Sequence, residues 1–494
     1  MRKRASGILM PISALPSKYG IGTLGKCAYE FIDFLSAAGQ KYWQLLPIGP
    51  TGFGDSPYSS FSSFAGNPYY IDVDMLIQNG LLDQAQVQSI DWGSEPDRID
   101  YSKIYANRFR VLQAAYDRGR ETYALEFQRF CEENNSWLDN YALYMAIKTQ
   151  NNMASWQQWQ DRDIRMHRQE AVARYEKSLQ GEIAFYKFMQ FLFFHQWDAL
   201  RNYAKKKGIS FIGDVPIYVA MDSADVWSEP QYFQLDENHT PTEVAGVPPD
   251  YFTQDGQLWG NPLYDYEAMA RDGYGWWIRR IDGARKLYDV IRIDHFRGFE
   301  SYWAVPSGNT TAKDGTWRVG PGMNLVEVLT SWFSDISFIA EDLGCITDSV
   351  RKLLADSGLP GMKVLEFAFD PDEESDYLPH NCTENSVCYL GTHDNDTVTG
   401  WLNSISDREK AFAADYMHIT PDEGWNWGMI RTGMATTSKL FIVQMQDVLK
   451  LPPHCRMNTP GSAEGNWQWR MTDTALNEQL AKKLCQYTKV YHRI

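Results

Sequence analysis

Short apolar runs of strand length recur along the chain, and most of them end in polar or acidic residues. Segments with helical periodicity lie between many of these runs. Apolar residues between positions 31 and 38 recur at helical spacing before Gly39, and 347–358 begins with Thr-Asp and ends with Gly. This repetition of strand and helix predicts a parallel sheet of buried strands. The runs are SGILMPI (6–12), YWQLLPI (42–48), ISFIGD (209–214), VIRIDH (290–295), FIAED (338–342), KVLEFAF (363–369) and VCYLGTHD (387–394).

Two α/β architectures fit this alternation, a closed (β/α)8 TIM barrel and an open doubly wound sheet. Barrel enzymes carry their reactive residues at the C-terminal ends of several different strands. Asp214, Asp294, Glu341 and Asp394 each close an apolar run. We therefore favour the (β/α)8 barrel.

The chain is much longer than a bare barrel, which takes about 250 residues, because it has 494. Large helical and loop insertions are expected at approximately 50–200, which is rich in amphipathic helical patterns, and at 221–275. The sequence contains no repeat of fixed period, no low-complexity tract and no Gly/Ser linker. We expect residues 1–494 to form a single catalytic domain with these two insertion subdomains.

The run VIRIDH turns two charges toward one face of an apolar strand. Successive side chains of a strand point to opposite sides, which puts Val290, Arg292 and Asp294 on one face and Ile291 and Ile293 on the other. Burying charges is costly unless they are paired. Two interpretations remain open: an Arg/Asp pair that only packs, and a reactive carboxylate that its neighbouring guanidinium keeps ionised.

Three carboxylates at the mouth of one barrel suit glycoside chemistry, in which one attacks the anomeric carbon, one protonates the leaving oxygen and one holds sugar hydroxyls. Asp294, Glu341 and Asp394 are the candidates. Arg292 favours the charged form of Asp294, and nearby negative charge raises the pKa of Glu341, as a general acid requires. Strand periodicity does not say whether Glu341 or Asp342 points inward. Structural ion pairs or helix caps remain the alternative for all these acids.

Aromatic residues make up 14% of the chain, with 18 Trp, 28 Tyr and 24 Phe. Sugars present C–H faces that pack on aromatic rings, so an aromatic-rich cleft suits them, although most of these rings belong to the core. The loop 248–264 is different, because Tyr251, Phe252 and Trp259 stand there among Gly, Pro and polar residues. We expect these three to bind substrate. The alternative is a loop packed on itself by its own aromatic side chains.

Composition excludes several other classes of function. A net charge of −16 repels a phosphate backbone, so no nucleic acid partner is expected. No stretch approaches the roughly 18 apolar residues of a membrane span, so no membrane partner is expected either. The seven cysteines are odd in number and scattered, which favours reduced thiols in a cytoplasmic protein. Pro11 and Ser13 interrupt the apolar run that an export signal needs.

The motifs that suggest a cofactor or a metal are incomplete. YGIGTLGK (19–26) contains G-x-G-x-x-G, but the next strand ends in LLPIGP, without the acid of a dinucleotide site. DPDEESD (370–376) lacks the central Gly and closing Glu of a calcium loop. THDND (392–396) could bind a metal, but the sequence has neither an HExxH motif nor paired cysteines to support a metal site. No cofactor and no metal site are therefore expected.

Several long motifs occur in a fixed order along almost the whole chain. They are GILMPISALPSKYGIGTLG, YWQLLPIGPTGFGDSPYSSFSSFAGNPYYID, GDVPIYVA, GVPPDYF, RIDHFRGFE, AEDLG, LPGMKVLEFAF, GTHDNDT and PGSAEGNWQWR. Together they resemble the 4-α-glucanotransferases of glycoside hydrolase family 77, within the α-amylase clan. Because the chain ends soon after GNWQWR, we expect no C-terminal β-sandwich domain of the kind that typical α-amylases carry.

The resemblance implies roles for individual residues. Asp294 matches the nucleophile, Glu341 the acid/base and Asp394 the transition-state stabiliser, which selects Glu341 over Asp342. Trp259 belongs to the loop that covers the acceptor region. Further matched positions contact or support the sugar around the cleaved bond: Tyr58, Asp214, Arg292, His295 and His393. The family binds no nucleotide, and no metal is expected.

The activity that the resemblance implies is transfer of α-1,4-glucan segments by a retaining double displacement. Donors would be maltooligosaccharides, starch or glycogen-derived glucans, and acceptors the 4-OH of another glucan or of glucose. A hydrolase with the same acids and a catalytically silent glucan-binding protein are the alternatives; the silent protein is disfavoured because every matched catalytic position is present. Phe53 stands where relatives often carry tyrosine, so a remote glucan contact there would lack its hydroxyl.

Overall fold

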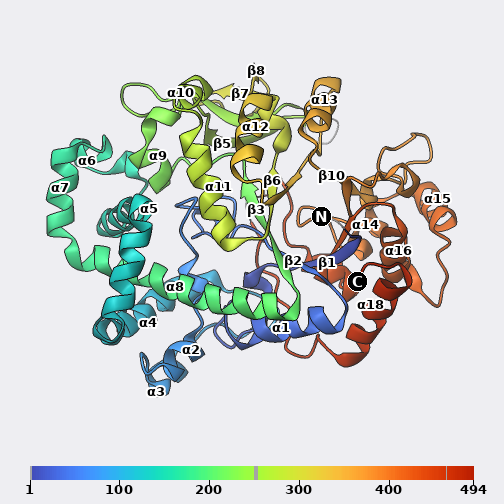
Figure 1. Ribbon diagram of the computed structural model, residues 1–494, viewed down its shortest axis with the longest axis horizontal. Helices are drawn as coiled ribbons and strands as arrows, with labels where there is room; N and C mark the ends of the chain where they lie inside the picture. Colours follow the sequence, from blue (N-terminus) through green and yellow to red (C-terminus); the bar gives the residue numbers. More distant parts are fainter. Residues whose placement is uncertain (1–2, 250–253, 463) are drawn as a thin grey trace.

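A closed barrel of eight parallel strands lies at the centre of the molecule (Figure 1), in a computed structural model that describes residues 3–249, 254–462 and 464–494. The strand order is β10-β11-β12-β1-β2-β3-β6-β9. A backbone hydrogen bond from Ala340 N to Pro360 O (2.9 Å) joins the end of β9 to the start of β10 and completes the ring. The predicted (β/α)8 barrel is confirmed. Its strands are β1 (Ala5–Leu9), β2 (Tyr42–Gln44), β3 (Ser210–Pro216), β6 (Val290–Asp294), β9 (Ser337–Ala340), β10 (Gly361–Val364), β11 (Ser386–Tyr389) and β12 (Leu440–Gln444).

Alternate side chains of these strands fill the barrel interior. Val290 packs in one apolar cluster with residues of the other strands, among them Ile339 and Met362. Ile291 and Ile293 belong instead to the larger core between the strands and the surrounding helices. The expected alternation along VIRIDH is confirmed, because Arg292 also lies inside, with its Nε 3.4 Å from Met362 Sδ.

Helices pack around the barrel, and two of them correspond to helical patterns in the sequence. The helix expected around 31–38 is α1, and its buried Phe31, Ile32 and Leu35 form the face toward the strands. The helix expected at 347–358 is α13: the Thr347 hydroxyl accepts the Val350 N–H, and Gly358 ends it in the left-handed conformation. The helices of this layer are α1 (Lys26–Ala37), α8 (Gln180–Lys207), α11 (Gly275–Leu287), α12 (Met323–Trp332), α13 (Asp348–Ser357), α16 (Gly424–Ala435) and α18 (Glu478–Val490).

A helical segment between β2 and β3 lies beside the barrel, on the left in Figure 1. Its long helices are α4 (Tyr101–Thr122) and α5 (Ala124–Gln150), and α5 packs along α8. Shorter helices complete it: α2 (Val73–Gln78), α3 (Gln84–Gln88), α6 (Arg162–Arg165) and α7 (Gln169–Ser178). The division of the chain into one domain with two insertion subdomains stays a prediction.

A small antiparallel sheet of order β5-β4-β7-β8 lies at the top of Figure 1. Two of its strands, β4 (Glu243–Val247) and β5 (Gln257–Pro262), come from the segment expected to be an insertion around 221–275, together with α9 (Ala224–Ser228) and α10 (Tyr266–Arg271). The other two, β7 (Ser301–Pro306) and β8 (Thr316–Val319), follow β6. The sheet therefore joins two connections of the barrel.

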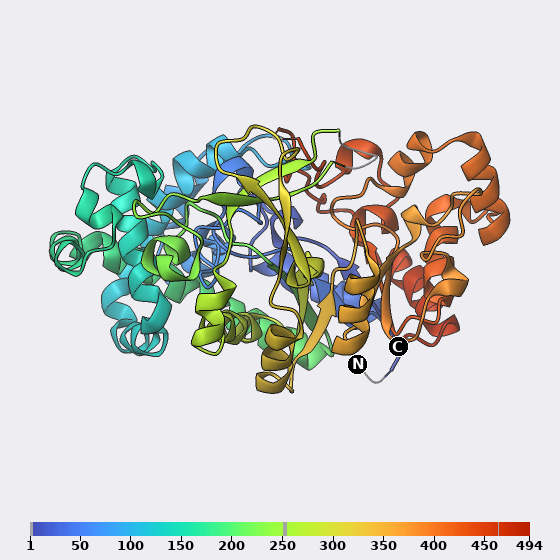
Figure 2. The same cartoon turned by 90° about the horizontal axis from the view of Figure 1, so that it is seen from above.

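The start of β1 lies beside the C-terminal residues at one edge of the molecule (Figure 2). The Arg493 guanidinium donates a hydrogen bond to the carbonyl oxygen of Ala5 (2.9 Å). The C-terminal part of the chain also contains three shorter helices: α14 (Val398–Ser404), α15 (Asp407–Met417) and α17 (Met445–Val448). Within the described ranges, none of the helices has the length and apolar character needed to cross a bilayer.

Candidate active site

Polar side chains gather where several barrel strands end, as expected for a barrel enzyme. Asp214 lies within β3, Asp294 is the last residue of β6, and Glu341 directly follows β9. Asp394 lies in the loop between β11 and α14, and Tyr58 in the connection after β2. The fold therefore brings residues that are more than 300 positions apart in the sequence to one end of the barrel.

Arg292 connects two of the carboxylates. Its Nη1 donates hydrogen bonds to both oxygens of Asp214 (2.6 and 2.7 Å) and to Oδ1 of Asp294 (2.9 Å). The side chains of Arg292 and Asp214 are 4% and 1% exposed, whereas that of Asp294 is 27% exposed. Burial raises the pKa of Asp214 and Arg292 opposes that rise. The cation thus holds one buried and one accessible carboxylate, and only Asp294 is open to a substrate.

Glu341 is held by two backbone N–H groups and is buried, with 8% of its surface exposed. His295 N donates to its Oε2 and Leu343 N to its Oε1, both at 2.7 Å. Burial first, and then the charge of Asp294, raise the pKa of Glu341 to about 8, although Arg292 and both backbone donors oppose the shift. The expected rise is confirmed, with burial rather than neighbouring charge as its main cause. Glu341 is therefore protonated at neutral pH, as a general acid requires.

The neighbouring backbone selects Glu341 rather than Asp342 for the site. His295 adopts the left-handed conformation (φ 56°), which is unfavourable for a residue with a side chain. This turn presents its N–H to Glu341. The Asp342 carboxylate lies instead against the start of β10, where its Oδ1 accepts the Met362 N–H (2.6 Å). The orientation that strand periodicity left open is thereby resolved.

Asp394 is oriented by a segment far along the chain. Asn458 Nδ2 donates to its Oδ1 (2.6 Å), and the Arg456 guanidinium donates to its backbone carbonyl. The Nε2 atom of His393 lies 3.3 Å from the same Oδ1. The Asp394 carboxylate is 45% exposed, so it is both fixed and accessible.

Tyr58 and His393 link the two halves of the site. The Tyr58 hydroxyl donates to Asp214 Oδ2 (2.6 Å) and lies 3.4 Å from His393 Nδ1. The two rings stack with centroids 5.1 Å apart and an interplanar angle of 17°. Contacts therefore run without a break from Asp294 through Arg292, Asp214, Tyr58 and His393 to Asp394.

Aromatic rings flank these polar groups. Trp259 on β5 is 39% exposed, and its ring meets the edge of His295 with centroids 4.8 Å apart. His295 is partly buried, and the loss of solvent around it lowers its pKa to about 4, which keeps the imidazole neutral. Trp467 packs against Tyr58 (5.9 Å) and His393 (6.0 Å). Of the residues expected to bind substrate, Tyr251 and Phe252 lie outside the described residues, as does the side chain of Phe53.

Sequence reasoning missed three residues of this site: Arg456, Asn458 and Trp467. All three lie between η9 (Pro453–Cys455) and α18, in a segment without a long regular element. The motif around GNWQWR marked the segment, but its residue types suggested no chemistry of their own. Their importance comes only from contacts with the Asp394 loop and with Tyr58.

Two buried carboxyls lie beneath the loop that carries Asp394. Asp447 Oδ1 accepts the Val398 N–H (2.7 Å) at the end of this loop, and the side chain of Asn395 hydrogen-bonds Glu366. Within the described residues, Glu366 Oε1 and Asp447 Oδ2 are shielded from solvent and have no hydrogen-bond partner. Burial and their mutual repulsion raise the pKa of Glu366 well above its usual range, and burial raises that of Asp447 to about 7. Both are therefore largely protonated below neutral pH.

We expect Asp447→Asn to become more stable relative to the wild type as the pH rises from 5 to 7. The pKa of Asp447 is raised by folding, so the folded protein keeps a proton that the unfolded chain releases above about pH 4. The stability due to that proton is present below pH 4 and is lost as the pH rises to about 7, by at most about 1.4 kcal/mol per unit. Asparagine keeps the acceptor for Val398 and does not titrate.

The measurement is urea unfolding of both proteins at pH 5, 6 and 7. Asp415→Asn, at an exposed position of α15, is the matched control and should differ from the wild type by the same amount at each pH. A difference between Asp447→Asn and the wild type that does not change with pH would show that Asp447 is already ionised in the folded protein.

The glycine motif at 19–26 serves packing. A Cβ on Gly22 would come within 1.8 Å of the Ile12 carbonyl oxygen, and Gly25 is the N-cap of α1, pressed against the Asp72 carboxylate. Backbone and side chain thus fill the space that a dinucleotide phosphate would need. Among the described residues, no three His, Cys, Asp or Glu side chains are grouped as a metal site requires.

Known proteins share this fold and its sequence over almost the full length. The family model Glyco_hydro_77, described as 4-alpha-glucanotransferase, matches residues 10–476. The 4-alpha-glucanotransferase of Clostridium butyricum is 46% identical over 486 residues, which cover 98% of this chain and all of that protein. That of Streptococcus pneumoniae is 46% identical over 496 residues, which cover 100% of this chain and 98% of that protein. The structure of amylomaltase from Streptococcus agalactiae in complex with acarbose superposes with a TM-score of 0.97 at 42% identity, covering 99% of this chain and 100% of that one.

These similarities extend over almost the whole chain. The chain belongs to glycoside hydrolase family 77 and is a 4-alpha-glucanotransferase.

Proposed function

We propose that Asp294, Glu341 and Asp394 perform the glucan transfer as a retaining double displacement. The observation that carries this assignment is the pairing of an acid protonated at neutral pH, Glu341, with a carboxylate held by a guanidinium, Asp294. The first step needs an acid that holds a proton and a second carboxyl that can attack the anomeric carbon. Support also comes from Asp294 at the end of β6 and Asp394 after β11, whose carboxylates are both partly exposed.

In the first step, Glu341 donates its proton to the glycosidic oxygen while Asp294 attacks the anomeric carbon. The bond from that carbon to the leaving oxygen breaks, the shortened glucan departs with the proton, and a covalent glycosyl–Asp294 ester remains. In the second step, the Glu341 carboxylate takes the proton of an acceptor 4-OH, whose oxygen displaces Asp294 from the opposite face. Two inversions give net retention, and Asp394 holds ring hydroxyls as the sugar flattens.

The substrates are α-1,4-glucans: maltooligosaccharides and chains derived from starch or glycogen as donors, and glucans or glucose as acceptors. Support comes from the aromatic rings of Trp259 and Tyr58 beside the carboxylates and from the acarbose bound by the Streptococcus agalactiae relative. The net charge of −16 disfavours nucleic acid. We also propose a cytoplasmic location, because all seven cysteines, which lie in the described residues, are free thiols.

We expect maltotriose alone to yield glucose together with maltooligosaccharides longer than maltotriose. A glycosyl–Asp294 ester that reacts with a second sugar must lengthen some chains as it shortens others, and the total number of reducing ends stays constant. Chromatography of the products over time, with a reducing-end assay in parallel, measures both quantities.

A hydrolase with the same three acids is the competing function, since it shares every step up to the ester. It would give only sugars shorter than maltotriose, with reducing ends that rise steadily. Asp294→Asn is the control for background reactions, because it keeps the shape of the site but removes the nucleophile.

A further inference from the structure

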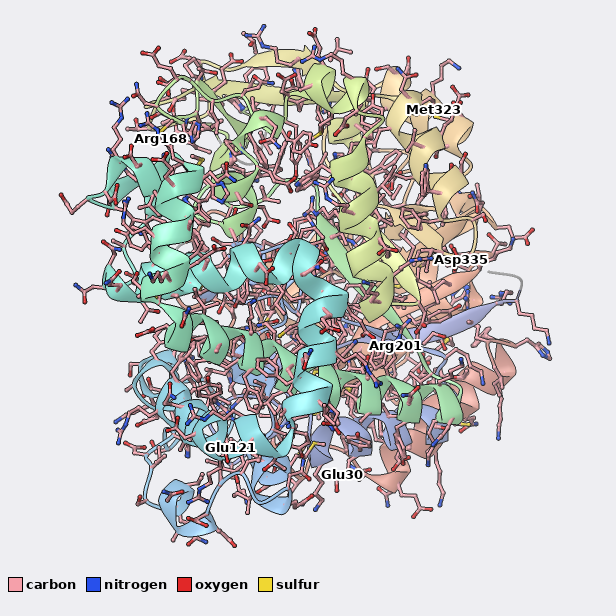
Figure 3. All side chains as sticks on the ribbon, turned by 60° about the vertical axis from the view of Figure 1, so that its left-hand side comes forward. Glu30, Glu121, Arg168, Arg201, Met323 and Asp335 are labelled. Atoms are coloured by element: carbon pink, nitrogen blue, oxygen red, sulfur yellow. The ribbon has the colours of Figure 1, made fainter. Side chains whose placement is uncertain are left out.

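A cavity of about 300 Å³ lies outside the barrel, between α5, α8, α9, α11 and the end of α12. Figure 3 brings this side of the molecule forward, with Arg201 of α8 labelled close to α11, to which it donates a hydrogen bond at the Lys286 carbonyl oxygen. Asp335, also labelled, follows α12. None of the carboxylates of the candidate active site lines this cavity. Its volume reaches the range of about 300 to 1,000 Å³ that small-molecule sites occupy.

Aromatic rings form one wall of the cavity. The rings of Phe64 and Trp137 are nearly parallel, with an interplanar angle of 16° and centroids 6.3 Å apart. Phe194 packs beside Trp137 at 6.0 Å. Phe64 and Trp137 are both partly exposed rather than sealed in the core. Rings that remain accessible in a concave site suit the C–H faces of a sugar.

The charged groups of the opposite wall neutralise one another. Arg279 pairs with Glu229 (2.5 Å), and Arg285 pairs with Asp282 (2.8 Å), which Lys286 also approaches. A cavity whose cations and anions are already paired gives little net attraction to an ion. It offers instead alternating donors and acceptors, to which the vicinal hydroxyls of a neutral sugar can bond two at a time.

The floor of the cavity contacts the segment that carries Tyr58. Asp225 is buried, and its Oδ2 accepts the Ser63 N–H (2.8 Å), while Ala224 N donates to the Phe61 carbonyl oxygen (2.9 Å). Residues 61–63 continue directly from Tyr58 of the active site. An occupant of the cavity would therefore lie behind the same loop whose front contributes to catalysis.

We propose that this cavity is a second, non-catalytic binding site for a segment of an α-1,4-glucan chain. The choice of α-glucan rests on the proposed function, since the enzyme meets that polymer as its substrate. A long donor chain held here stays near the barrel between catalytic events, which lowers the concentration needed for the next one. Short oligosaccharides gain nothing, because they have no distal segment to hold.

The test compares two arginine substitutions at neighbouring exposed positions of α5. Ser136 lines the cavity and Asn135 does not. Both variants are made on an Asp294→Asn background, so that maltoheptaose is bound but not consumed. Titration calorimetry measures the number of maltoheptaose molecules bound per chain. Ser136→Arg should bind one maltoheptaose fewer per chain than Asn135→Arg. Equal numbers would overturn the proposal.

The kinetic arm uses the same two substitutions in the active enzyme. With amylose as donor and glucose as acceptor, Ser136→Arg should raise the KM for amylose severalfold over Asn135→Arg, while both give the same rate on maltotriose. Equal KM values for amylose would also overturn the proposal. If Ser136→Arg unfolds, Trp137→Leu, which removes the ring and adds no charge, replaces it in both arms.

Failure of the proposed function gives a different result. An enzyme that does not lengthen maltotriose at all refutes the glucan transfer, whatever the variants bind. An enzyme that lengthens maltotriose, but whose two arginine variants are indistinguishable on amylose and maltoheptaose, refutes only the second site.

Discussion

Glu341→Gln should lower kcat on maltotriose about a thousandfold, within the range that loss of a general acid produces. Glutamine has nearly the shape of glutamate and still accepts the His295 N–H, but it carries no proton for the leaving oxygen. With maltosyl fluoride as donor, whose leaving group needs no protonation, formation of the glycosyl–Asp294 ester should stay close to the wild-type rate. The measurement is single-turnover kinetics with the two donors.

The pH profile gives an independent check on the same variant. The pKa of Glu341 is about 8, so kcat/KM of the wild type should fall above pH 8 as the acid loses its proton. That basic limb should be absent from Glu341→Gln. Asp342→Asn is the control: its carboxylate faces the Met362 N–H rather than the mouth, so it should keep both the limb and most of the rate. An equal loss with both donors would exclude Glu341 as the acid.

Seven of the eight barrel strands overlap apolar runs that could be read from the sequence, most of which end in a polar residue, although β10 shares only Lys363 and Val364 with the run 363–369. The eighth, β12 (LFIVQ), has the same character but is followed at once by MQDV, which forms α17. Short apolar runs beside a helix carry no period that separates strand from helix. Its partner strands β1 and β11 decide the matter, and the paired residues Ala5 and Val387 lie 435 and 53 residues before Leu440.

The candidate site shows the same limit at the level of single side chains. Alternation along one strand was enough to put Arg292 and Asp294 inside the barrel. The alternation could not predict that Arg292 would pair with Asp214 on β3, because Asp214 lies 78 residues earlier in the chain. The contacts of Arg456 and Asn458 with Asp394 span more than 60 residues and start from an irregular segment. Local patterns fix which way a side chain points, whereas closure of the barrel fixes what it meets.

Arg292→Met should fold and lose on the order of a hundredfold or more in kcat, each tenfold being about 1.4 kcal/mol of lost transition-state stabilisation. Methionine fills the buried volume but leaves Asp214 and Asp294 facing each other without the cation that hydrogen-bonds both. The two carboxylates then favour a shared proton, as like charges in one site do. A protonated Asp294 is a poor nucleophile.

The pH profile of Arg292→Met separates this electrostatic role from simple packing. Without Arg292, the proton shared by Asp214 and Asp294 should move the acidic limb to higher pH. Arg292 also lowers the pKa of Glu341, so its removal should move the basic limb to higher pH as well. Arg280→Met is the matched control, because Arg280 is equally buried but donates to the carbonyl oxygens of Ile217 and Pro216 rather than to a carboxylate. It should lose stability without shifting either limb.

A second substitution keeps the test informative if the single variant unfolds. Arg292→Met with Asp214→Asn removes the buried charge that lost its partner, so the fold should recover while Asp294 still lacks its cation. A folded double variant with a shifted pH profile and a large loss in kcat would support the electrostatic role. Near-normal turnover with unmoved limbs would show that the arginine of VIRIDH only packs, and that Asp294 needs no neighbouring cation to remain a nucleophile.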